Sequence, residues 1–181
     1  MDIKRFILET IETIITSIIV LLIIYSTIAL PEVVWGSSME PNFETNERIL
    51  VDKLSKVIDP VYTRGEVVVL KPQNSSRHLI KRIIGVPGDI FKIYDCNVYV
   101  NQDNERFVLE EDYLAEGTCT TGGSHIENGR SFKLQEDEYV ALGDNRAVSL
   151  DSRSIGVVTK DDIVGRVSFR FWPIAKIGFV R

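Results

Sequence analysis

Histidine and cysteine are both scarce in this sequence, which has two residues of each. His78 and His125 do not lie at ligand spacing from Cys96 and Cys119, so the pattern of a zinc site is absent and no metal is expected. Neither histidine lies in a sequence context typical of a catalytic base. Acid–base chemistry in this protein is therefore expected to use other side chains.

An excess of positive charge is also lacking. The chain has 21 Lys and Arg residues against 26 Asp and Glu residues, a net charge of −5, and its basic residues are scattered. Proteins that bind nucleic acid cluster such residues, so nucleic acid is not an expected partner. The sequence has no internal repeat and no long low-complexity tract. Residues 31–181 are enough for one domain with a real core and a small inserted lobe.

What the sequence does have is an apolar run near its N-terminus. Residues 13–30 carry no charge and are about long enough for a bilayer-spanning helix, which needs roughly 20 residues. We therefore predict a transmembrane anchor at 13–30 after a short cytoplasmic segment at 1–12. Lys4 and Arg5 favour a cytoplasmic N-terminus and an external remainder. The alternatives are a buried helix of a soluble protein and a cleavable signal peptide, whose apolar region is usually shorter.

The rest of the chain is predicted to be mostly β. Short segments rich in β-branched or aromatic residues alternate with turn sequences. The predicted strands are 47–52, 66–70, 79–85, 90–94, 97–100, 139–142 and 163–171. These strands favour an antiparallel, barrel-like domain, with helix confined to the anchor and a turn near 159–162. The polar stretch at about 101–129 is predicted to be a small, mobile insertion rather than a second folding unit.

Both cysteines fall in the part of the chain predicted to lie outside the cell. An oxidising exterior favours a disulfide between Cys96 and Cys119, which would stabilise the fold by about 3 kcal/mol in the chain-entropy model. Spacing alone does not show that the geometry permits the bond. Two unpaired thiols are therefore the alternative.

Two motifs offer a nucleophile and a base without histidine. Ser38 lies in the turn sequence Gly-Ser-Ser-Met-Glu-Pro, and Lys81 lies in a predicted strand where Leu79 and Ile83 share its face. Desolvation lowers the pKa of a lysine, as a lysine base at neutral pH requires. Each motif also has a plainer interpretation. Ser38 would then belong to an ordinary turn, and Lys81 would extend its ammonium group to solvent.

A third segment, residues 143–156, is rich in paired charges. It contains two Asp-x-Arg sequences with a serine between them, namely Asp144, Arg146, Ser149, Asp151 and Arg153. Charge-assisted hydrogen bonds within such pairs can lock a loop and fix Ser149 to orient another group. The plainer interpretation is a salt-bridged surface loop. A calcium site is disfavoured because the Asp spacing does not fit the EF-hand pattern.

The motifs follow the apolar run in a fixed order. They are Ser38-Met39-x-Pro41, a strand region at 52–70, Lys81-Arg82-x-x-Gly85-x-Pro87-Gly88-Asp89 and Gly143-Asp144-Asn145-Arg146-x-x-Ser149-x-Asp151-Ser152-Arg153. This arrangement resembles bacterial type I signal peptidases, the membrane-bound Ser-Lys endopeptidases that remove signal peptides from exported preproteins. The resemblance spans essentially the whole chain.

The resemblance implies a role for each of these polar residues. Ser38 would be the nucleophile, Lys81 the general base, and Ser149 the hydroxyl that positions Lys81. Asp151 and Arg153 would form a supporting salt bridge. The backbone N–H of Ser38 would serve the oxyanion hole, and no cofactor is implied.

The resemblance also implies the partners, which are preprotein signal peptides and the lipid bilayer. The substrate would carry small residues at −1 and −3 and dock as an added strand, with Phe43 and Ile49 as candidates for lining its pockets. Gly36 stands where certain members have a serine that completes the oxyanion hole, so the second donor is not identified. The single anchor and compact ectodomain are more like the Gram-positive branch. The alternative functions are a non-enzymatic pilus-assembly relative and a Ser-Lys peptidase with one dedicated substrate.

Overall fold

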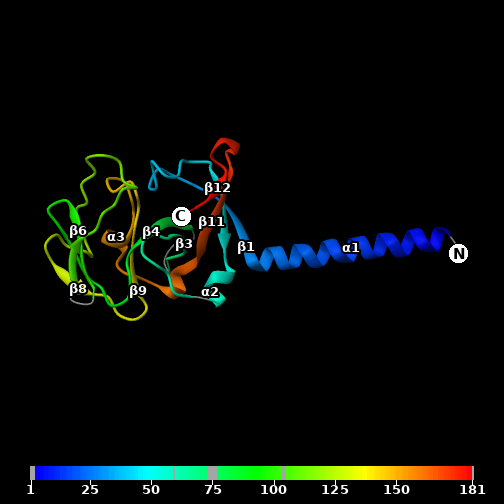
Figure 1. Ribbon diagram of the computed structural model, residues 1–181, viewed down its shortest axis with the longest axis horizontal. Coiled ribbons are helices and arrows are strands. Elements are labelled where there is room, and N and C mark those ends of the chain that lie inside the picture. The colour runs from blue at the N-terminus through cyan, green and yellow to red at the C-terminus, as the bar shows by residue number, and fades with distance from the viewer. Residues whose placement is uncertain (1–2, 59, 73–76, 103–104, 181) are drawn as a thin grey trace.

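A long helix stands away from a β-domain in this protein (Figure 1). The computed structural model describes residues 3–58, 60–72, 77–102 and 105–180. Helix α1 (Ile3–Ile28) places the N-terminus far from the β-domain, whereas the C-terminus lies within that domain. The arrangement confirms the predicted mostly β fold with an N-terminal apolar helix.

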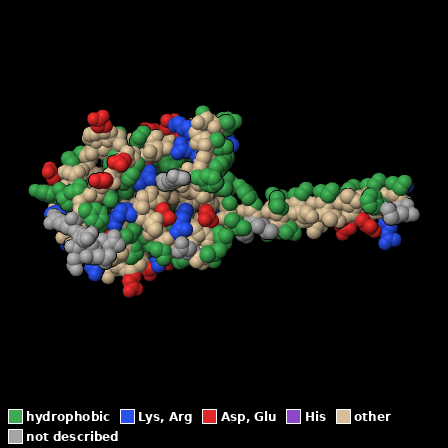
Figure 2. Space-filling view, in the orientation of Figure 1, with side chains coloured by type: hydrophobic (Ala, Val, Ile, Leu, Met, Phe, Trp, Pro, Cys, Tyr) green, Lys and Arg blue, Asp and Glu red, His purple; other side chains and the backbone are tan. Residues whose placement is uncertain are grey.

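Helix α1 has the character expected of a membrane span. Its stretch Ile3–Ile23 is long and apolar enough to cross a bilayer. Its apolar side chains are exposed, and Figure 2 shows hydrophobic atoms along the helix with charges gathered towards its N-terminal end. Four hydroxyls each donate to the carbonyl four residues earlier at 2.8 Å, those of Thr10, Thr13, Thr16 and Ser17. Polar groups satisfied inside the helix do not need water.

The boundaries of α1 differ from the predicted anchor. The helix begins at Ile3, ten residues before the predicted start, and ends at Ile28, so most of the segment 1–12 is also helical. Strand β1 (Ala29–Val33) follows without a linker. The cause is Pro31, which disfavours helical backbone at the residue before it.

The main sheet contains eight antiparallel strands in the order β1-β2-β11-β3-β4-β9-β10, with β12 paired to β11. Besides β1, the strands are β2 (Arg48–Asp52), β3 (Val67–Leu70), β4 (Leu79–Gly85), β9 (Glu138–Leu142), β10 (Val158–Thr159), β11 (Ile163–Trp172) and β12 (Gly178–Phe179). The short helices are α2 (Leu54–Ile58), α3 (Ser152–Ile155), η1 (Lys160–Asp162) and η2 (Ile174–Lys176). Buried side chains on both faces of β3 pack into separate clusters, with Val67 and Val69 in one and Val68 and Leu70 in the other.

A second, four-stranded sheet forms the inserted lobe. Its order is β7-β6-β5-β8, formed by β5 (Ile90–Tyr94), β6 (Asn97–Gln102), β7 (Glu105–Val108) and β8 (Ser131–Lys133). Strands β5 and β6, which were predicted for the barrel, therefore belong to this lobe. The lobe is larger than the predicted insertion at 101–129. Residues 103–104 of that insertion lie outside the described part. Phe91 and Val98 pack with Val140 and Leu142 of β9. Because its core is shared with the main sheet, the lobe is not a separate folding unit.

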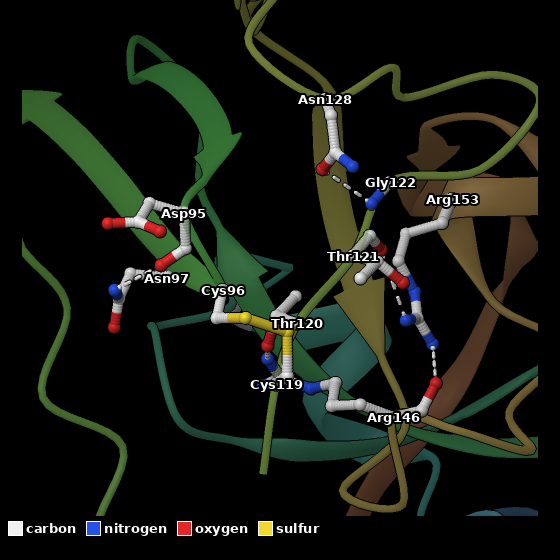
Figure 3. Close-up of a disulfide and its surroundings, with 10 residues drawn as sticks. All are labelled: Asp95, Cys96, Asn97, Cys119, Thr120, Thr121, Gly122, Asn128, Arg146 and Arg153. Atoms are coloured by element: carbon white, nitrogen blue, oxygen red, sulfur yellow. Dashed lines mark hydrogen bonds between the residues drawn. A yellow bond between two sulfur atoms is a disulfide. The ribbon is translucent and has the colours of Figure 1, made fainter.

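Cys96 and Cys119 form a disulfide on the surface of the lobe (Figure 3). The bond confirms the predicted pairing and excludes the alternative of two free thiols. It attaches the turn between β5 and β6 to the long segment that connects β7 with β8. The next residue of that segment, Thr120, donates its backbone N–H to the Cys96 carbonyl at 3.0 Å.

Candidate active site

Ser38 and Lys81 meet beside strand β4 of the main sheet. Lys81 extends from β4 and is 2% exposed, whereas Ser38 is half-buried in the turn that follows β1. The Lys81 Nζ donates to Ser38 Oγ at 2.8 Å and to the Ile80 carbonyl at 2.7 Å. The lysine is therefore buried and directed at the serine rather than extended to solvent. A serine and a buried amine at this distance can act as a nucleophile and its base.

Burial is the main influence on the pKa of Lys81. Desolvation lowers this pKa to about 8, while Asp151 and Asp144 act in the opposite direction and Arg153 lowers it further. Removal of solvent destabilises the charged ammonium more than the neutral amine. A substantial fraction of Lys81 is therefore neutral near pH 8 and able to accept a proton.

The first prediction concerns the pH dependence of the reaction. Because the base must be unprotonated, kcat/KM should rise with pH through an apparent pKa of about 8 and level off above it. Initial rates on a signal-peptide substrate between pH 6 and pH 11 would measure this value. An inflection near about 10.4, the pKa of a solvated lysine, would show that burial does not lower the pKa of Lys81.

The turn that carries Ser38 is anchored on the core by its next residue. Met39 is 1% exposed and accepts the Phe43 N–H at 2.9 Å, and Glu40 N–H donates to the Ser37 carbonyl at 3.2 Å. Within the described residues, the Ser38 N–H donates to no protein acceptor. This N–H is therefore available to an oxyanion, and the oxyanion role that the resemblance implies for it stays a prediction.

Gly36 has a φ of +81°, and a Cβ at this position would meet no atom within 4 Å. Backbone conformation rather than space therefore explains the glycine. We expect Gly36→Ala and Gly36→Ser to lose about 1–2 kcal/mol of folding free energy, the cost of left-handed backbone for an L-residue, and to lose activity to the same extent. Denaturant unfolding and kcat would measure both effects. A serine variant faster than the wild type would instead indicate a missing oxyanion donor.

Only one of the two Asp-x-Arg sequences forms an internal ion pair. Asp144 is fully buried and binds Arg82 of β4 through two hydrogen bonds of 2.7 and 2.9 Å. Arg146 instead binds Glu111 of the inserted lobe at 2.5 Å. The predicted pairing within Asp144-x-Arg146 is therefore wrong. The reason is the sheet: Leu142 lies opposite Arg82 in the β4–β9 pair, which brings Asp144 to Arg82.

The second sequence pairs internally, so Asp151 and Arg153 make the predicted salt bridge, with Nη2 to Oδ2 at 2.8 Å. Asp151 also accepts the Gly143 N–H at 3.0 Å and caps α3. Burial by itself would raise the pKa of Asp151, but the Arg153 guanidinium and the Gly143 N–H together act against burial, and the pKa lies below its usual range. Asn145 of the same loop donates its N–H to the Ser38 carbonyl at 3.0 Å. The loop is thus tied to the nucleophile.

Ser149 makes no hydrogen bond to Lys81. Its Oγ is buried and makes no hydrogen bond of normal geometry among the described residues, although it lies close enough to Asp151 to help lower the pKa of that carboxyl. The hydroxyl packs against Gly143, where a side chain would overlap it. The role of orienting Lys81 therefore stays a prediction for Ser149.

A cavity of about 560 Å³ opens in front of Ser38 and Lys81. Its walls come from β1 and β4, and its lining includes Glu32, Val33, Trp35, Val69, His78, Leu79 and Ile80. The His78 Nδ1 lies 2.5 Å from Glu32 Oε1, so this pair joins the two walls. Strand β1 was not predicted, because its one proline and its glutamate interrupt a strand pattern only five residues long.

Phe43 and Ile49, the predicted pocket residues, do not line this cavity. Phe43 is 1% exposed beneath the Arg170 guanidinium, and Ile49 is fully buried in the cluster shared by β2 and β11. Period-two alternation identifies the inward face of a strand, but it does not separate core positions from cavity positions. Val69, Leu79 and Ile80 are the apolar residues that the structure offers instead.

The inserted lobe supports the loop next to Ser38 (Figure 3). Beside the disulfide, the Thr120 hydroxyl accepts a hydrogen bond from Arg146. Arg153 donates to the Thr121 carbonyl at 3.3 Å and to the Arg146 carbonyl at 2.7 Å. Sequence reasoning missed the contacts of Thr120 and Thr121 because they join segments far apart in the chain. Within the described residues, no group of three or more His, Cys, Asp or Glu side chains could hold a metal ion.

Known proteins are similar in sequence to this chain over nearly its whole length. Residues 7–172 match the family model described as signal peptidase, peptidase S26. A probable signal peptidase I-2 of Synechocystis sp. is 36% identical over 96% of this chain and 77% of its own length. A signal peptidase IB of Staphylococcus aureus is 35% identical over 96% of this chain and 93% of its own length.

A solved structure also aligns with the chain, that of a signal peptidase I from Enterococcus faecalis V583. It has 24% sequence identity and a TM-score of 0.45, covering 59% of this chain and 97% of that one. None of these similarities supports a pilus-assembly protein or a peptidase with one dedicated substrate. The family match and the two relatives above 30% identity show that this chain belongs to the signal peptidase family, peptidase S26, and is a serine endopeptidase.

Proposed function

We propose that this protein removes signal peptides from exported preproteins, with Ser38 as nucleophile and Lys81 as general base. The observation that carries the proposal is the 2.8 Å hydrogen bond between Lys81 Nζ and Ser38 Oγ at the end of a cavity. Burial supplies the lowered pKa that a lysine base needs. Phe43 and Ile49 are not part of the proposed site, because neither of them lines this cavity.

The reaction follows from this geometry. Lys81 takes the Ser38 proton while Oγ attacks the scissile carbonyl, and the Ser38 N–H donates to the oxyanion that forms. Collapse of the tetrahedral intermediate breaks the C–N bond, Lys81 returns the proton to the departing amine, and an acyl-enzyme remains. Lys81 then deprotonates the water that hydrolyses the ester. Asp151 and Arg153 hold the neighbouring loop in position.

The cavity suits an extended peptide. Among the described strands, β1 pairs only with β2, and the first half of β4 pairs only with β3. Two free strand edges therefore flank the cavity and can hydrogen-bond a substrate strand. Val69, Leu79 and Ile80 provide apolar contacts, which suits small side chains at −1 and −3.

The proposal includes the position of the enzyme in the membrane. The exposed apolar surface of α1 supports a single-pass anchor, and Lys4 and Arg5 near its start favour a cytoplasmic N-terminus with the catalytic domain outside. Trp35 follows β1 and is 78% exposed, which suits contact with the bilayer interface. A Gram-positive origin stays a prediction, since relatives from a staphylococcus and a cyanobacterium are about equally similar.

Cleavage of a whole preprotein tests this function. Purified full-length protein in detergent micelles should cut a preprotein after its −1 residue, and mass spectrometry of both products would identify the bond. The matched substrate carries Phe instead of Ala at −1 and should not be cut. Cleavage at several unrelated bonds, or equal cleavage of both substrates, would contradict the proposal.

A further inference from the structure

A second cavity, of about 510 Å³, lies next to the turn that carries Ser38. Glu40 and Pro41 form its first wall, residues from 115 to 119 of the inserted lobe form the second, and residues 144–147 form the third. It shares no lining residue with the cavity that contains Lys81. It is therefore a separate space and not an extension of the one already described.

The second cavity adjoins the turn that carries Ser38 at residues that the first cavity does not contact. The first cavity, between β1 and β4, reaches Ser38 and ends there, whereas the second begins at Glu40, two residues further along the same turn. Its third wall touches the nucleophile residue directly, because Asn145 N–H donates to the Ser38 carbonyl at 3.0 Å. A peptide whose acyl side fills the first cavity brings its leaving-group side to the second.

The polar groups of this cavity differ in whether they are already bound. Asp144 is neutralised by Arg82, and Arg146 is neutralised by Glu111. In contrast, the half-buried Glu40 carboxylate makes no ion pair and no hydrogen bond among the described residues, and neither does the Asn145 side-chain amide. The Glu40 carboxylate and the Asn145 amide are thus the groups left to bind a ligand. Because the carboxylate is negative, it favours a ligand with positive charge.

The wall from the inserted lobe is already in place. The disulfide fixes Cys119, and Thr118 donates both its N–H and its hydroxyl to the Ala115 carbonyl, at 3.1 and 2.6 Å. Gly117 has a φ of +75°, which completes this tight turn. Because these constraints already hold the wall in one conformation, a binding peptide does not have to order it. The entropy cost of binding is therefore lower, which favours affinity.

We infer that the second cavity binds the first residues of the mature chain, with Asn145 bonding the peptide backbone and Glu40 favouring a basic side chain over an acidic one. This inference rests on the proposed function and adds a specificity that acts on the leaving-group side. Charge pairs that remain partly exposed contribute modestly, so we expect each charge change to alter kcat/KM by about 2- to 5-fold.

Peptide length gives the first test. Two substrates share the sequence up to the scissile bond, and one ends a single residue after it whereas the other extends five residues further. The longer peptide should have the higher kcat/KM, and reduction of the disulfide should remove most of that difference by raising KM of the longer peptide alone. Equal kcat/KM for both lengths would overturn the inference, while absence of cleavage of any peptide would instead contradict the proposed function.

Charge exchange gives the second test. Extended peptides with Lys or Glu at the second mature residue are compared on the wild type, Glu40→Gln and Glu40→Lys. The preference for Lys, expressed as the ratio of kcat/KM for the two peptides on the same enzyme, should vanish in Glu40→Gln and reverse in Glu40→Lys. Glu116→Gln is the control and should keep the wild-type preference. Glu116 is an exposed acid between the lining residues Ala115 and Gly117, but it does not line the cavity itself. An unchanged Lys-to-Glu ratio in Glu40→Lys would overturn the assignment.

Discussion

Ser38→Ala and Lys81→Met should each lower kcat/KM by about 10⁴-fold or more, and the double variant should be no slower than either. The reason is the single hydrogen bond that joins Lys81 Nζ to Ser38 Oγ. Without the base the hydroxyl is not activated, and without the hydroxyl the base has no proton to accept. Residues that act as one unit are therefore strongly non-additive. Steady-state cleavage of a fluorogenic signal-peptide substrate would measure all three variants.

A folding control separates this loss from instability. Lys81→Met replaces a buried amine with an apolar side chain of similar length, so its Tm should be at least that of the wild type. Lys56→Met is the matched activity control, because Lys56 lies on α2 and bonds the Asp161 carbonyl away from the site. Cleavage near the wild-type rate by Lys81→Met would show that another group is the base.

Gly143→Ala should have the next largest effect. A Cβ on Gly143 would overlap the Ser149 hydroxyl and lie 2.5 Å from the Ser38 carbonyl oxygen, so the loop or the nucleophile must move. Displacement of a reacting group by about 1 Å can cost roughly 100-fold in rate, and we expect at least that loss in kcat. Single-turnover kinetics on a saturating substrate would measure it.

Gly178→Ala provides the comparison for Gly143→Ala. A Cβ at Gly178 in β12 would meet no atom within 4 Å, so neither rate nor Tm should change. Thermal unfolding of both variants would show whether the main fold persists. Wild-type kcat in Gly143→Ala would mean that the loop beside Ser38 adapts without disturbing the nucleophile.

Local sequence patterns suggested the central pair of residues, and the resemblance to signal peptidases assigned their roles. Lys81 could be placed on an inward face because a strand repeats every two residues, and its flanking apolar residues indicated the burial that the structure shows. Turn residues around Ser38 indicated that this serine lies in a turn, where the structure places it half-buried. The disulfide prediction combined the external location with the cysteine count, and it is confirmed.

Contacts between distant segments could not be predicted in this way. Nothing near Arg146 indicates that its partner is Glu111, 35 residues earlier, or that Asp144 turns to Arg82. Strands β5 and β6 are short runs rich in β-branched and aromatic residues, as are the strands of the main sheet, so their composition did not show that they form a second sheet. Such choices depend on which strands become neighbours, and periodicity carries no information about neighbours.

The direct passage of α1 into β1 limits which bonds the enzyme can reach. The Ile28 carbonyl that ends the helix accepts the Lys53 N–H at 2.9 Å, and Ala29 is already paired with Asp52. Glu32 and Val33 of the cavity wall follow only four and five residues later, a span of about 13–17 Å in extended chain. With α1 in the bilayer, the cavity has no flexible tether and stays at one height above the lipid. A preprotein with an acceptable sequence far from its own apolar segment would therefore remain uncut, so distance from the membrane selects substrates together with side-chain size.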